Sequence, residues 1–459
     1  MVDQLTRRGF LAASSAALAA QARKPNVILM YADDLGYGDL GCYGGKIRTP
    51  HLDRIAAEGT RFTQCLSANP VCSPSRAALL TGRYPTRVNI PRVLFPRDNE
   101  GLPMDETTIA QMLKPSGYRT MCVGKWHLGH HPEHLPTAHG FDEYFGIPYS
   151  NDMDPPMVLR SGGGKVETVE ARADMNTLAG HYTREAVSFI DRAKNDPFFL
   201  YFPNTFPHIP LGASAKFRGK SAQGIYGDVV EELDHGVGEV LSALKRNNLE
   251  RDTLILFSSD NGPWYLGSPG PLRGRKGSTY EGGVRVPLLA KLPGRIAAGK
   301  VSATLASTMD VLPTIATLTG AKLPAKPLDG IDLTPVLSGK QLAIEREALL
   351  YFDNWHAQCI RHGQYKLHLS RYNSQVYSPA PATGRINLPL PQPELYNVAT
   401  DIDESYDIAP EKPEVVKDLT ARYERLLASF PQEVTEAWAK TKTFKTTGQT
   451  GTFPRVVPQ

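Results

Sequence analysis

Four short polar segments of the chain contain the residue types that acid–base and metal chemistry require, and each follows an apolar run. The segments are Asp33 with Asp34, Lys125 with His127, His208, and Asp260 with Asn261. A single His or an Asp pair after a strand is usually a cap or a loop hydrogen bond. Four such segments indicate a shared site, because an ordinary connecting loop has no need of a charge at every turn.

The two carboxylate-bearing segments predict a bound metal ion. Asp33, Asp34, Asp260 and Asn261 each offer an oxygen donor, and oxygen donors are the ligands of hard cations such as Ca²⁺ and Mg²⁺. A zinc site would be expected to include His or Cys, and neither pair contains one. The alternative is a site without a metal, in which Asp34 caps a helix and residues 260–262 form an Asx turn.

The elements that must position these groups follow from hydrophobic periodicity. Continuous apolar runs predict strands buried on both faces, and apolar residues three and four apart predict helices. The predicted strands are residues 27–32, 118–123, 198–202, 253–257 and 286–290, and the predicted helices are residues 107–113, 183–192 and 226–244. This alternation predicts an α/β fold with a large, mainly parallel sheet covered by helices on both sides. Ligands of such folds bind outside the carboxyl ends of the strands, where the four polar segments fall.

Composition excludes several classes of protein. The chain has 459 residues, of which 41% are hydrophobic and 21% charged, so it is neither disordered nor collagen-like. Its formal net charge is +4, from 51 Lys and Arg against 47 Asp and Glu, which is too balanced to indicate a nucleic-acid partner. Five cysteines in so long a chain exclude a disulfide framework, and the odd number leaves at least one thiol without an intramolecular partner.

The first 22 residues predict an export signal. Residues 6–11 read TRRGFL, residues 11–20 form a short run of small, mostly apolar residues, and residues 20–22 read AQA. This layout is typical of a bacterial twin-arginine signal peptide, and we expect cleavage after Ala22. We therefore expect a periplasmic or exported protein that the twin-arginine (Tat) machinery carries folded, without stable membrane insertion after cleavage. The alternative is an amphipathic helix or a retained anchor.

One cysteine stands in a longer motif. Residues 72–76 read CSPSR and residues 79–83 read LLTGR. This string resembles the signature of the type I sulfatase family, in which the cysteine is oxidised after translation to Cα-formylglycine, an aldehyde. Further segments resemble family motifs, namely residues 33–36 (DDLG), 124–129 (GKWHLG), 259–262 (SDNG) and 274–285 (GRKGSTYEGGVR). Residues 146–150 (GIPYS) are most similar to the arylsulfatase A and N-acetylgalactosamine-6-sulfatase subgroups.

The resemblance, which covers nearly the whole chain after the signal, implies a fold like that of alkaline phosphatase and hydrolysis of an O-sulfate ester. It implies a metal site formed by the two carboxylate-bearing pairs with the modified Cys72, and we favour Ca²⁺ over Mg²⁺. It also implies a maturation enzyme that generates the formylglycine. Sulfate contacts are expected from Lys125, Ser150, His208 and Lys276, although a turn explains Ser150 equally well.

These residue types suit the chemistry of a sulfate monoester. Its oxygens must be neutralised as the S–O bond breaks, so catalysis requires a metal and cationic donors. A hydrated aldehyde at residue 72 has two hydroxyls on one carbon; one attacks sulfur, and loss of the proton from the other then expels sulfate and restores the aldehyde. We assign His127 as the base for that second step, and Arg76 as the group that holds the hydrate oxygen and pairs with a metal-ligand carboxylate. His208 or Lys276 protonates the leaving alcohol.

The carboxy-terminal part differs in character. Residues 309–318 predict a helix, and a stretch rich in Pro and Gly follows. We predict a catalytic domain over residues 23–330, a connector over 331–345, an α+β subdomain over 346–440 and a loosely ordered tail over 441–459. In the subdomain we expect short antiparallel strands at residues 349–352, 359–361 and 365–369, with one helix at 413–430. The resemblance to sulfatases implies a further, late strand at residues 394–398. Residues 371–393 are expected to form a Pro-rich loop, which either rims the site or is a solvated connection.

The sequence therefore predicts a sulfatase acting on a sulfated small molecule or saccharide. The competing enzyme hypothesis is a phosphomonoesterase, phosphodiesterase or phosphonate hydrolase of the alkaline phosphatase superfamily, but Asn261 argues against a two-zinc phosphatase, which would use His ligands. The competing non-enzyme hypothesis is a sulfoglycan-binding protein in which Cys72 stays a thiol. Loops such as residues 92–97 are expected to select the substrate.

Overall fold

The computed structural model describes residues 24–374, 384 and 386–444 of the chain. The predicted signal peptide and most of the predicted tail lie outside these residues. The described residues form two sheets, one of eleven strands and one of four. Within the described ranges, no helix is both long and apolar enough to cross a membrane.

The centre of the larger sheet is parallel and almost entirely buried. Its four strands, in spatial order, are β3 (Arg119–Val123), β7 (Phe198–Pro203), β1 (Asn26–Ala32) and β8 (Thr253–Ser259). These strands confirm four of the predicted apolar runs. Because every residue of β1 is buried, both faces of the sheet must be covered, as continuous apolarity predicts.

The outer strands make the sheet mixed. The predicted run at residues 286–290 is β9 (Arg285–Lys291), and it pairs antiparallel with β8. The remaining outer strands are β2 (Thr60–Leu66), β4 (Glu143–Gly146), β5 (Val158–Gly162), β6 (Lys165–Glu170), β10 (Lys300–Ser302) and β11 (Ala306–Ser307). The expected mixed, mainly parallel sheet is thus confirmed, with its antiparallel pairs at the two sides.

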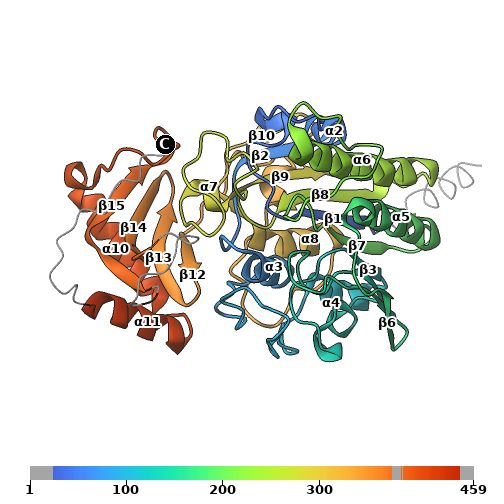
Figure 1. Ribbon diagram of the computed structural model, residues 1–459. Helices are drawn as coiled ribbons and strands as arrows, with labels where there is room; N and C mark the ends of the chain where they lie inside the picture. Colours follow the sequence, from blue (N-terminus) through green and yellow to red (C-terminus); the bar gives the residue numbers. More distant parts are fainter. Residues whose placement is uncertain (1–23, 375–383, 385, 445–459) are drawn as a thin grey trace, which may run out of the picture.

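Helices cover both faces of this sheet, as Figure 1 shows. One face carries α2 (Pro50–Glu58), α5 (Met175–Ala193) and α6 (Gly224–Arg246), and the other carries α3 (Cys72–Thr81), α4 (Ile109–Leu113) and α8 (Val311–Thr319). Alternate residues of β1 divide between the two cores, since Leu29 packs with the second group of helices and Ile28 with the first. The helical predictions are confirmed in place, although α5 begins eight residues earlier than the apolar periodicity at Thr183 indicates.

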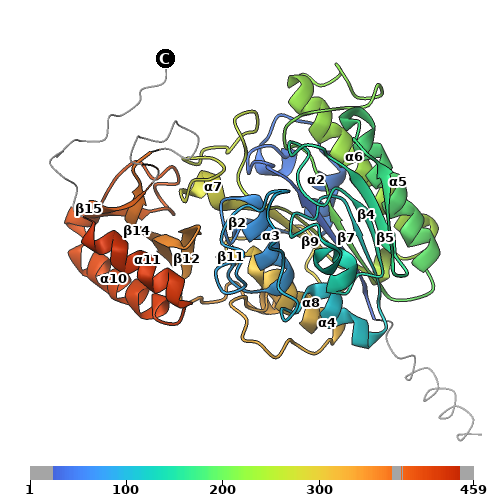
Figure 2. The ribbon, with the colours of Figure 1, turned by 60° about the horizontal axis from the view of Figure 1, so that its bottom comes forward.

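The second sheet is a small antiparallel meander next to the first. It consists of β12 (Leu349–Asp353), β13 (His356–His362), β14 (Tyr365–Tyr372) and β15 (Asn387–Asn397). Two helices, α10 (Pro413–Leu427) and α11 (Gln432–Thr443), pack on it (Figure 2). The predicted sheet and first helix are confirmed; α11 is an additional helix, and it includes the first residues of the predicted tail.

The predicted loop at residues 371–393 is wrong at both ends, because β14 reaches Tyr372 and β15 starts at Asn387. Pro389, Pro391 and Pro393 lie within β15 at every second position. This is possible because β15 is an edge strand, where backbone nitrogens at alternate positions have no partner strand.

Short helices complete the described structure. They are α7 (Glu281–Val284), α9 (Thr334–Leu337) and the 3₁₀ turns η1 (Gly41–Tyr43), η2 (Lys114–Ser116), η3 (Pro132–His134), η4 (Pro136–His139), η5 (Glu250–Asp252), η6 (Thr308–Asp310) and η7 (Ala409–Glu411). Of these, α7 matters most for the site, because it lies between the two sheets. Val284 of α7 shares a core with Leu350 of β12 and Leu367 of β14.

Candidate active site

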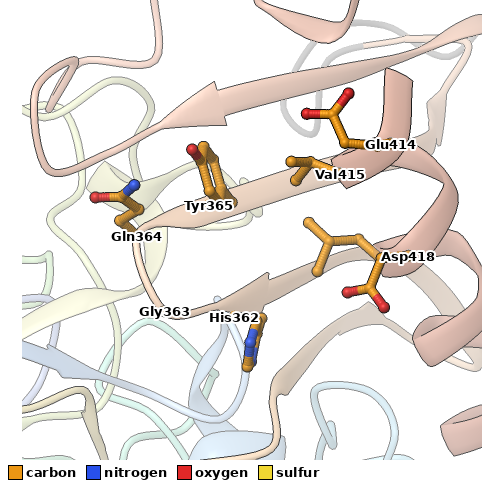
Figure 3. Close-up of a pocket in the computed structure, with 8 residues that line it drawn as sticks. His362, Gly363, Gln364, Tyr365, Glu414, Val415 and Asp418 are labelled. Carbon is orange, nitrogen blue, oxygen red and sulfur yellow. The ribbon is translucent and has the colours of Figure 1, made fainter. Parts of the chain in front are cut away.

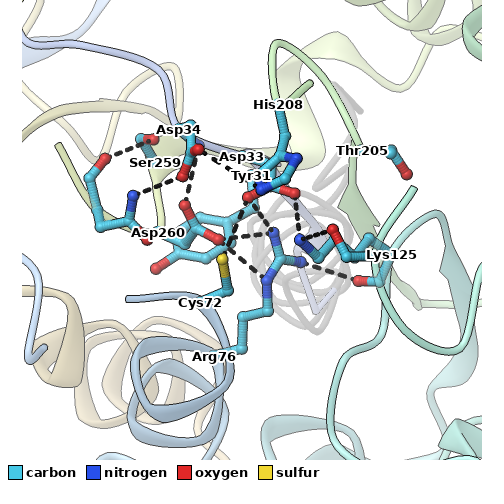
Figure 4. Close-up of polar contacts among 12 residues, drawn as sticks. Tyr31, Asp33, Asp34, Cys72, Arg76, Lys125, Thr205, His208, Ser259 and Asp260 are labelled. Atoms are coloured by element: carbon cyan, nitrogen blue, oxygen red, sulfur yellow. Dashed lines mark hydrogen bonds and ion pairs between the residues drawn. The ribbon is translucent and has the colours of Figure 1, made fainter. Parts of the chain in front are cut away.

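The four predicted polar segments meet at one edge of the larger sheet. Strand β1 lies between β7 and β8, and Ala32 of β1 pairs with Ser259 of β8, so Asp33 and Asp260 follow the two strands side by side. The segments that contain Lys125 and His208 follow the neighbouring strands β3 and β7. Figure 4 shows that these side chains point toward one another.

The carboxylate-bearing pairs form one buried cluster. The backbone N–H of Asp34 donates to Oδ1 of Asp260 at 3.1 Å, and Nδ2 of Asn261 donates to Oδ1 of Asp34 at 2.7 Å. Ligand atoms of Asp33, Asp34, Cys72 and His208 all lie within 4.8 Å of one another. The structure therefore places the five predicted metal ligands in one cluster and adds the imidazole of His208; they are Asp33, Asp34, Cys72, Asp260 and Asn261.

One atom of this cluster tests whether a cation fits. Oδ1 of Asn261 is buried and has no hydrogen-bond partner among the described residues. A buried acceptor without a donor is costly, so such an atom requires an explanation. A hard cation supplies one, because amide and carboxylate oxygens are its preferred ligands. The side chains of Asp33, Asp34, Asp260 and Asn261 therefore fit a Ca²⁺ or Mg²⁺ ion.

Burial and neighbouring charges together shift the pKa values of Asp260 and Asp33 in opposite directions. Burial and the neighbouring charge of Asp33 raise the pKa of Asp260 to about 7, against the opposing effect of Arg76. Burial would also raise the pKa of Asp33, but Lys125, His208 and Arg76 hold it well below its usual range. Asp33 is accordingly the more strongly ionised of the two.

Cys72 is the first residue of α3, and it faces this cluster. Its Sγ lies 3.6 Å from Oδ1 of Asp33. Burial raises the pKa of the Cys72 thiol to about 12, although Lys125 and Lys276 act in the opposite direction. An unmodified thiol at this position therefore stays protonated and is a weak nucleophile.

Arg76 follows Cys72 by one helical turn and enters the same cluster. Its Nε and Nη2 both donate to Oδ2 of Asp260, at 3.1 and 2.9 Å, and its Nη1 donates to the carbonyl of Lys125 at 2.9 Å. The side chain is fully buried. Arg76 therefore pairs with a carboxylate that is one of the predicted metal ligands.

Lys125 connects two parts of the site. Its Nζ donates to Oδ2 of Asp33 and, at 3.0 Å, to Oγ of Ser150. The preceding Gly124 has φ of +130°, and a Cβ there would lie 1.9 Å from the carbonyl oxygen of Pro203. Glycine thus lets β3 pass close to β7 just before Lys125, and the N–H of Lys125 donates to that same carbonyl at 2.7 Å.

Asn151 is a buried residue that the sequence analysis does not single out. Its Oδ1 accepts from Oγ of Ser150 at 3.3 Å, and its Nδ2 donates to the carbonyls of His208 and Pro210 at 3.1 and 3.2 Å. It therefore links the Lys125 side of the site to the His208 segment. The only sequence signal for it is its position directly after Ser150.

Two further cationic or basic groups contact Asp34. The Nζ of Lys276 lies 2.8 Å from Oδ1 and 2.9 Å from Oδ2 of this carboxylate. The Nε2 of His208 lies 3.7 Å from Oδ2, and its Nδ1 contacts the carbonyl of Ile209. The structure thus brings Lys125, His208 and Lys276 to the same carboxylate cluster from three different loops.

His127 is held in one tautomer. Its Nε2 lies 2.9 Å from the carbonyl oxygen of Leu94, and because a carbonyl only accepts, Nε2 carries the proton. Its Nδ1 is buried and without a hydrogen-bond partner in the described part of the chain. Burial, followed by the charges of Lys125 and Arg76, lowers the pKa of His127 well below 6.5. Nδ1 is therefore a free base at neutral pH.

A separate surface groove of about 430 Å³ lies on the second sheet (Figure 3). Its lining combines Tyr365 and Leu419 with the carboxylates of Glu414 and Asp418. None of the predicted site residues lines it. Two carboxylates at its edge would repel a sulfate or phosphate ester, so the groove does not compete as the anionic substrate site.

Comparison with known proteins gives the family. The family model named Sulfatase matches residues 25–321, and the model for the C-terminal part of N-sulphoglucosamine sulphohydrolase matches residues 275–427. The chain is 40% identical to human arylsulfatase A over 90% of its own length and 89% of that protein. The chain belongs to the sulfatase family. It is a sulfuric ester hydrolase of that family, which hydrolyses sulfate esters.

The other relatives support the predicted subgroup and fold. The N-acetylgalactosamine-6-sulfatase of Rattus norvegicus is 41% identical over 77% of this chain and 73% of its own length. The crystal structure of Ps i-CgsB in complex with k-i-k-neocarrahexaose matches with a TM-score of 0.76 at 33% identity, covering 92% of this chain and 98% of that chain. The sequence-based resemblance to arylsulfatase A and N-acetylgalactosamine-6-sulfatase is confirmed.

Proposed function

We propose that this sulfatase hydrolyses O-sulfate monoesters of carbohydrates, with Cys72 oxidised to Cα-formylglycine by a maturation enzyme and one Ca²⁺ at the carboxylate cluster. The observation that carries the proposal is the position of Cys72, whose Sγ lies 3.6 Å from Oδ1 of Asp33 in a fully buried site. The raised pKa of its thiol supports modification, because the thiol itself would remain protonated. The Ps i-CgsB complex with k-i-k-neocarrahexaose supports a saccharide as substrate.

Asp33, Asp34, Asp260 and Asn261 would hold the calcium ion, together with residue 72. When bound, the ion would supply positive charge to the oxygens of the sulfate group. Lys125, His208 and Lys276 would bind the remaining oxygens, with Ser150 as a neutral donor beside Lys125. The site concentrates these donors in a buried space, where each interaction is stronger than in water.

The modified side chain at residue 72 would supply, as its hydrate, two hydroxyls on one carbon, one to attack sulfur and the other to lose the proton that releases sulfate. Nδ1 of His127 accepts that proton, since Nε2 is committed to Leu94. Arg76 orients the hydrate oxygen and keeps Asp260 in place. His208 or Lys276 protonates the leaving alcohol, since Nε2 of His208 and Nζ of Lys276 both lie beside the carboxylate of Asp34.

Export by the twin-arginine route remains part of this proposal. Arg7 and Arg8 support it. Because that route carries folded proteins, oxidation of Cys72 and metal binding could be completed in the cytoplasm. Replacement of both arginines by lysine is expected to retain active enzyme in the cytoplasm, measured by activity in periplasmic and cytoplasmic fractions.

The deciding experiment compares the turnover of an aryl sulfate and an aryl phosphate by the same preparation, co-produced with a formylglycine-generating enzyme. We expect a sulfate kcat/KM that exceeds the phosphate value by at least tenfold. A preparation of Cys72→Ala is the control for contaminating hydrolases. A dominant phosphatase rate would refute the proposal. If the sulfate rate dominates, a panel of sulfated saccharides would identify the sugar.

A further inference from the structure

Charged side chains are buried between the second sheet and the loop that carries Lys276. Glu281 begins α7, and its Oε1 lies 3.1 Å from Nζ of Lys366 on β14. Glu404 contacts the same Lys366 nitrogen at 3.3 Å and Nε2 of His368 at 3.0 Å. We call these four residues, Glu281, Lys366, His368 and Glu404, the interface cluster. Its two carboxylates and its lysine are completely shielded from solvent.

The Lys276 loop is attached to the second part of the chain on both sides of the lysine. Before Lys276, Nη1 of Arg273 donates to the carbonyl of Glu404 at 2.7 Å. After it, the N–H of Glu281 donates to Oε2 of Glu404 at 2.6 Å. Oγ1 of Thr279 also donates to Oε1 of Gln358 on β13 at 3.0 Å. Glu404 therefore holds both ends of the segment that presents Lys276.

The loop has little freedom to absorb a shift at these attachments. A Cβ at Gly283 would lie 2.0 Å from the carbonyl oxygen of Ser278, so the segment folds tightly on itself. The N–H of Gly277 donates to the carbonyl of Pro70 at 2.8 Å, which connects the loop to the segment before Cys72. A displacement at Glu281 or Arg273 would thus be passed on to Lys276.

Joining two parts of a protein through buried charged groups carries a large desolvation penalty. Burying ions costs more free energy than burying apolar side chains of similar volume, and such pairs are retained in some proteins because they fix one geometry. Burial alone would raise the pKa of Glu281, but Lys366, Arg285 and Arg361 hold it below its ordinary value, so the carboxylate is ionised. The interface cluster therefore supplies directional, charged contacts where an apolar contact would allow sliding.

We propose that the interface cluster is a positioning device that sets the place of Lys276 in the active site. The inference rests on the proposed function, in which Lys276 contacts the sulfate ester. Glu404 is then a positioning residue, because it touches the Lys276 loop and not the substrate. The second sheet would in this way contribute to catalysis without lending a side chain to the reaction.

The test is a double-mutant cycle of Glu404→Gln with Lys276→Ala, measured with an aryl sulfate. We expect Glu404→Gln to lower kcat/KM at least tenfold when Lys276 is present and less than twofold in the Lys276→Ala background. The matched control is Tyr423→Phe, because this change removes a hydrogen bond between α10 and β13, from the Tyr423 hydroxyl to the carbonyl of Ala357, and leaves the contacts of Glu404 with the Lys276 loop intact. This control is expected to lower the unfolding temperature with kcat/KM unchanged.

Amide hydrogen exchange gives a readout that does not depend on turnover. In Glu404→Gln we expect faster exchange across residues 274–284 with unchanged protection of β12 and β13, and no such change in Tyr423→Phe. If Glu404→Gln does not fold, Gln358→Leu removes the contact with Thr279 and leaves the charges intact. Equal losses of kcat/KM in both Lys276 backgrounds, or unchanged exchange in the loop, would overturn the proposal. If the parent enzyme, co-produced with a formylglycine-generating enzyme, shows no sulfatase activity, the proposed function fails. The exchange result alone then tests whether Glu404 positions the Lys276 loop.

Discussion

Arg76 places two guanidinium nitrogens, Nε and Nη2, on a single oxygen of Asp260, at 3.1 and 2.9 Å. The other oxygen of Asp260 accepts from the backbone N–H of Asp34. Because Arg76 lies one helical turn after Cys72, this pair fixes the distance between the start of α3 and the end of β8. The residue at position 72 and the carboxylate cluster are thereby held as one unit.

Arg76→Lys tests this coupling. Lysine keeps the positive charge but cannot donate through a planar fork to Asp260 and to the carbonyl of Lys125 together. We expect kcat/KM for an aryl sulfate to fall by about 10²–10³, the range found when one preorganised donor is removed. The matched control is Arg160→Lys, since Arg160 makes a bidentate pair with Glu185 at the surface. A loss of similar size in the control would mean that the effect is not specific to the site.

Mass spectrometry of the peptide that contains Cys72 tests the modification. After co-production with a formylglycine-generating enzyme, we expect an aldehyde at residue 72, whereas Cys122, buried in β3, should remain a thiol in the same sample. Cys72→Ala should abolish turnover and leave the unfolding temperature close to that of the parent. Persistence of the Cys72 thiol in an active preparation would contradict the mechanism and would favour a different nucleophile.

Asn261→Leu tests the metal site. The substitution removes the unpaired Oδ1 and the hydrogen bond from Nδ2 to Asp34. We expect the affinity for Ca²⁺, measured by calorimetry on metal-depleted protein, to fall at least tenfold, since one oxygen ligand of a hard cation is lost. Asn176→Leu is the control, because Asn176 makes a similar contact with Asp174 at the surface. Unchanged Ca²⁺ affinity in Asn261→Leu would exclude Asn261 as a ligand.

His127→Asn tests the base. Asn is the suitable replacement because residue 127 has φ of +61°, a conformation that Asn tolerates better than most residues. We expect kcat to fall by about 10²–10⁴, with a burst of one equivalent of alcohol per enzyme, since the sulfated residue 72 can form but cannot release sulfate. Rapid-quench kinetics would measure this burst, and its absence would place His127 in the first step.

The pH profile of the parent enzyme gives a second test of His127. Activity needs the neutral imidazole, and its pKa lies well below 6.5 because of burial, Lys125 and Arg76. As the pH falls through that pKa, Nδ1 gains a proton and the release of sulfate stops. We therefore expect the acid limb of kcat to lie below pH 6.5. A limb centred at or above that value would contradict either the lowered pKa of His127 or its assignment as the base.

Much of this site could be predicted from the sequence, because its residues follow parallel strands whose ends lie at one edge of the sheet. The apolar runs that become β1, β3, β7 and β8 are continuous, so each strand could be located, and parallel strands bring their carboxyl ends to one edge. Residues just after those strands could be grouped without any knowledge of distances. Asn151 could not be found in this way, since its role depends on where the carbonyls of His208 and Pro210 fall in space.

The second sheet was harder to predict because its signals are weaker. Only three residues of α11 are buried, namely Val434, Ala437 and Thr441, so its apolar periodicity is slight. The prolines of β15 predict a loop when only the neighbouring residues are considered. A strand is possible there because β15 lies at the edge of the sheet. The interface cluster is a further case, because Glu281, Lys366 and Glu404 are far apart in the sequence and look like ordinary surface charges there.

Glu281→Gln tests the energetic contribution of that cluster through pH. The pKa of the Glu281 carboxyl is lowered in the folded protein by Lys366, Arg285 and Arg361, which outweigh burial. A depressed pKa stabilises the fold above the unfolded value of 4.5, and this stabilisation is lost as the pH falls through the folded pKa. Below pH 4.5 the parent should therefore lose stability more steeply than the variant, by up to about 1.4 kcal/mol per pH unit.

At neutral pH the full stabilisation by the Glu281 carboxylate is present. The variant should be less stable than the parent, because Lys366 and Arg285 lose the charge that compensates them. Urea unfolding followed by circular dichroism between neutral pH and about pH 3 measures both regimes. Glu414→Gln is the control, since it removes the same kind of charge from an exposed acid on α10. Parallel stability curves for the parent and Glu281→Gln below pH 4.5 would show that folding does not lower the pKa of Glu281.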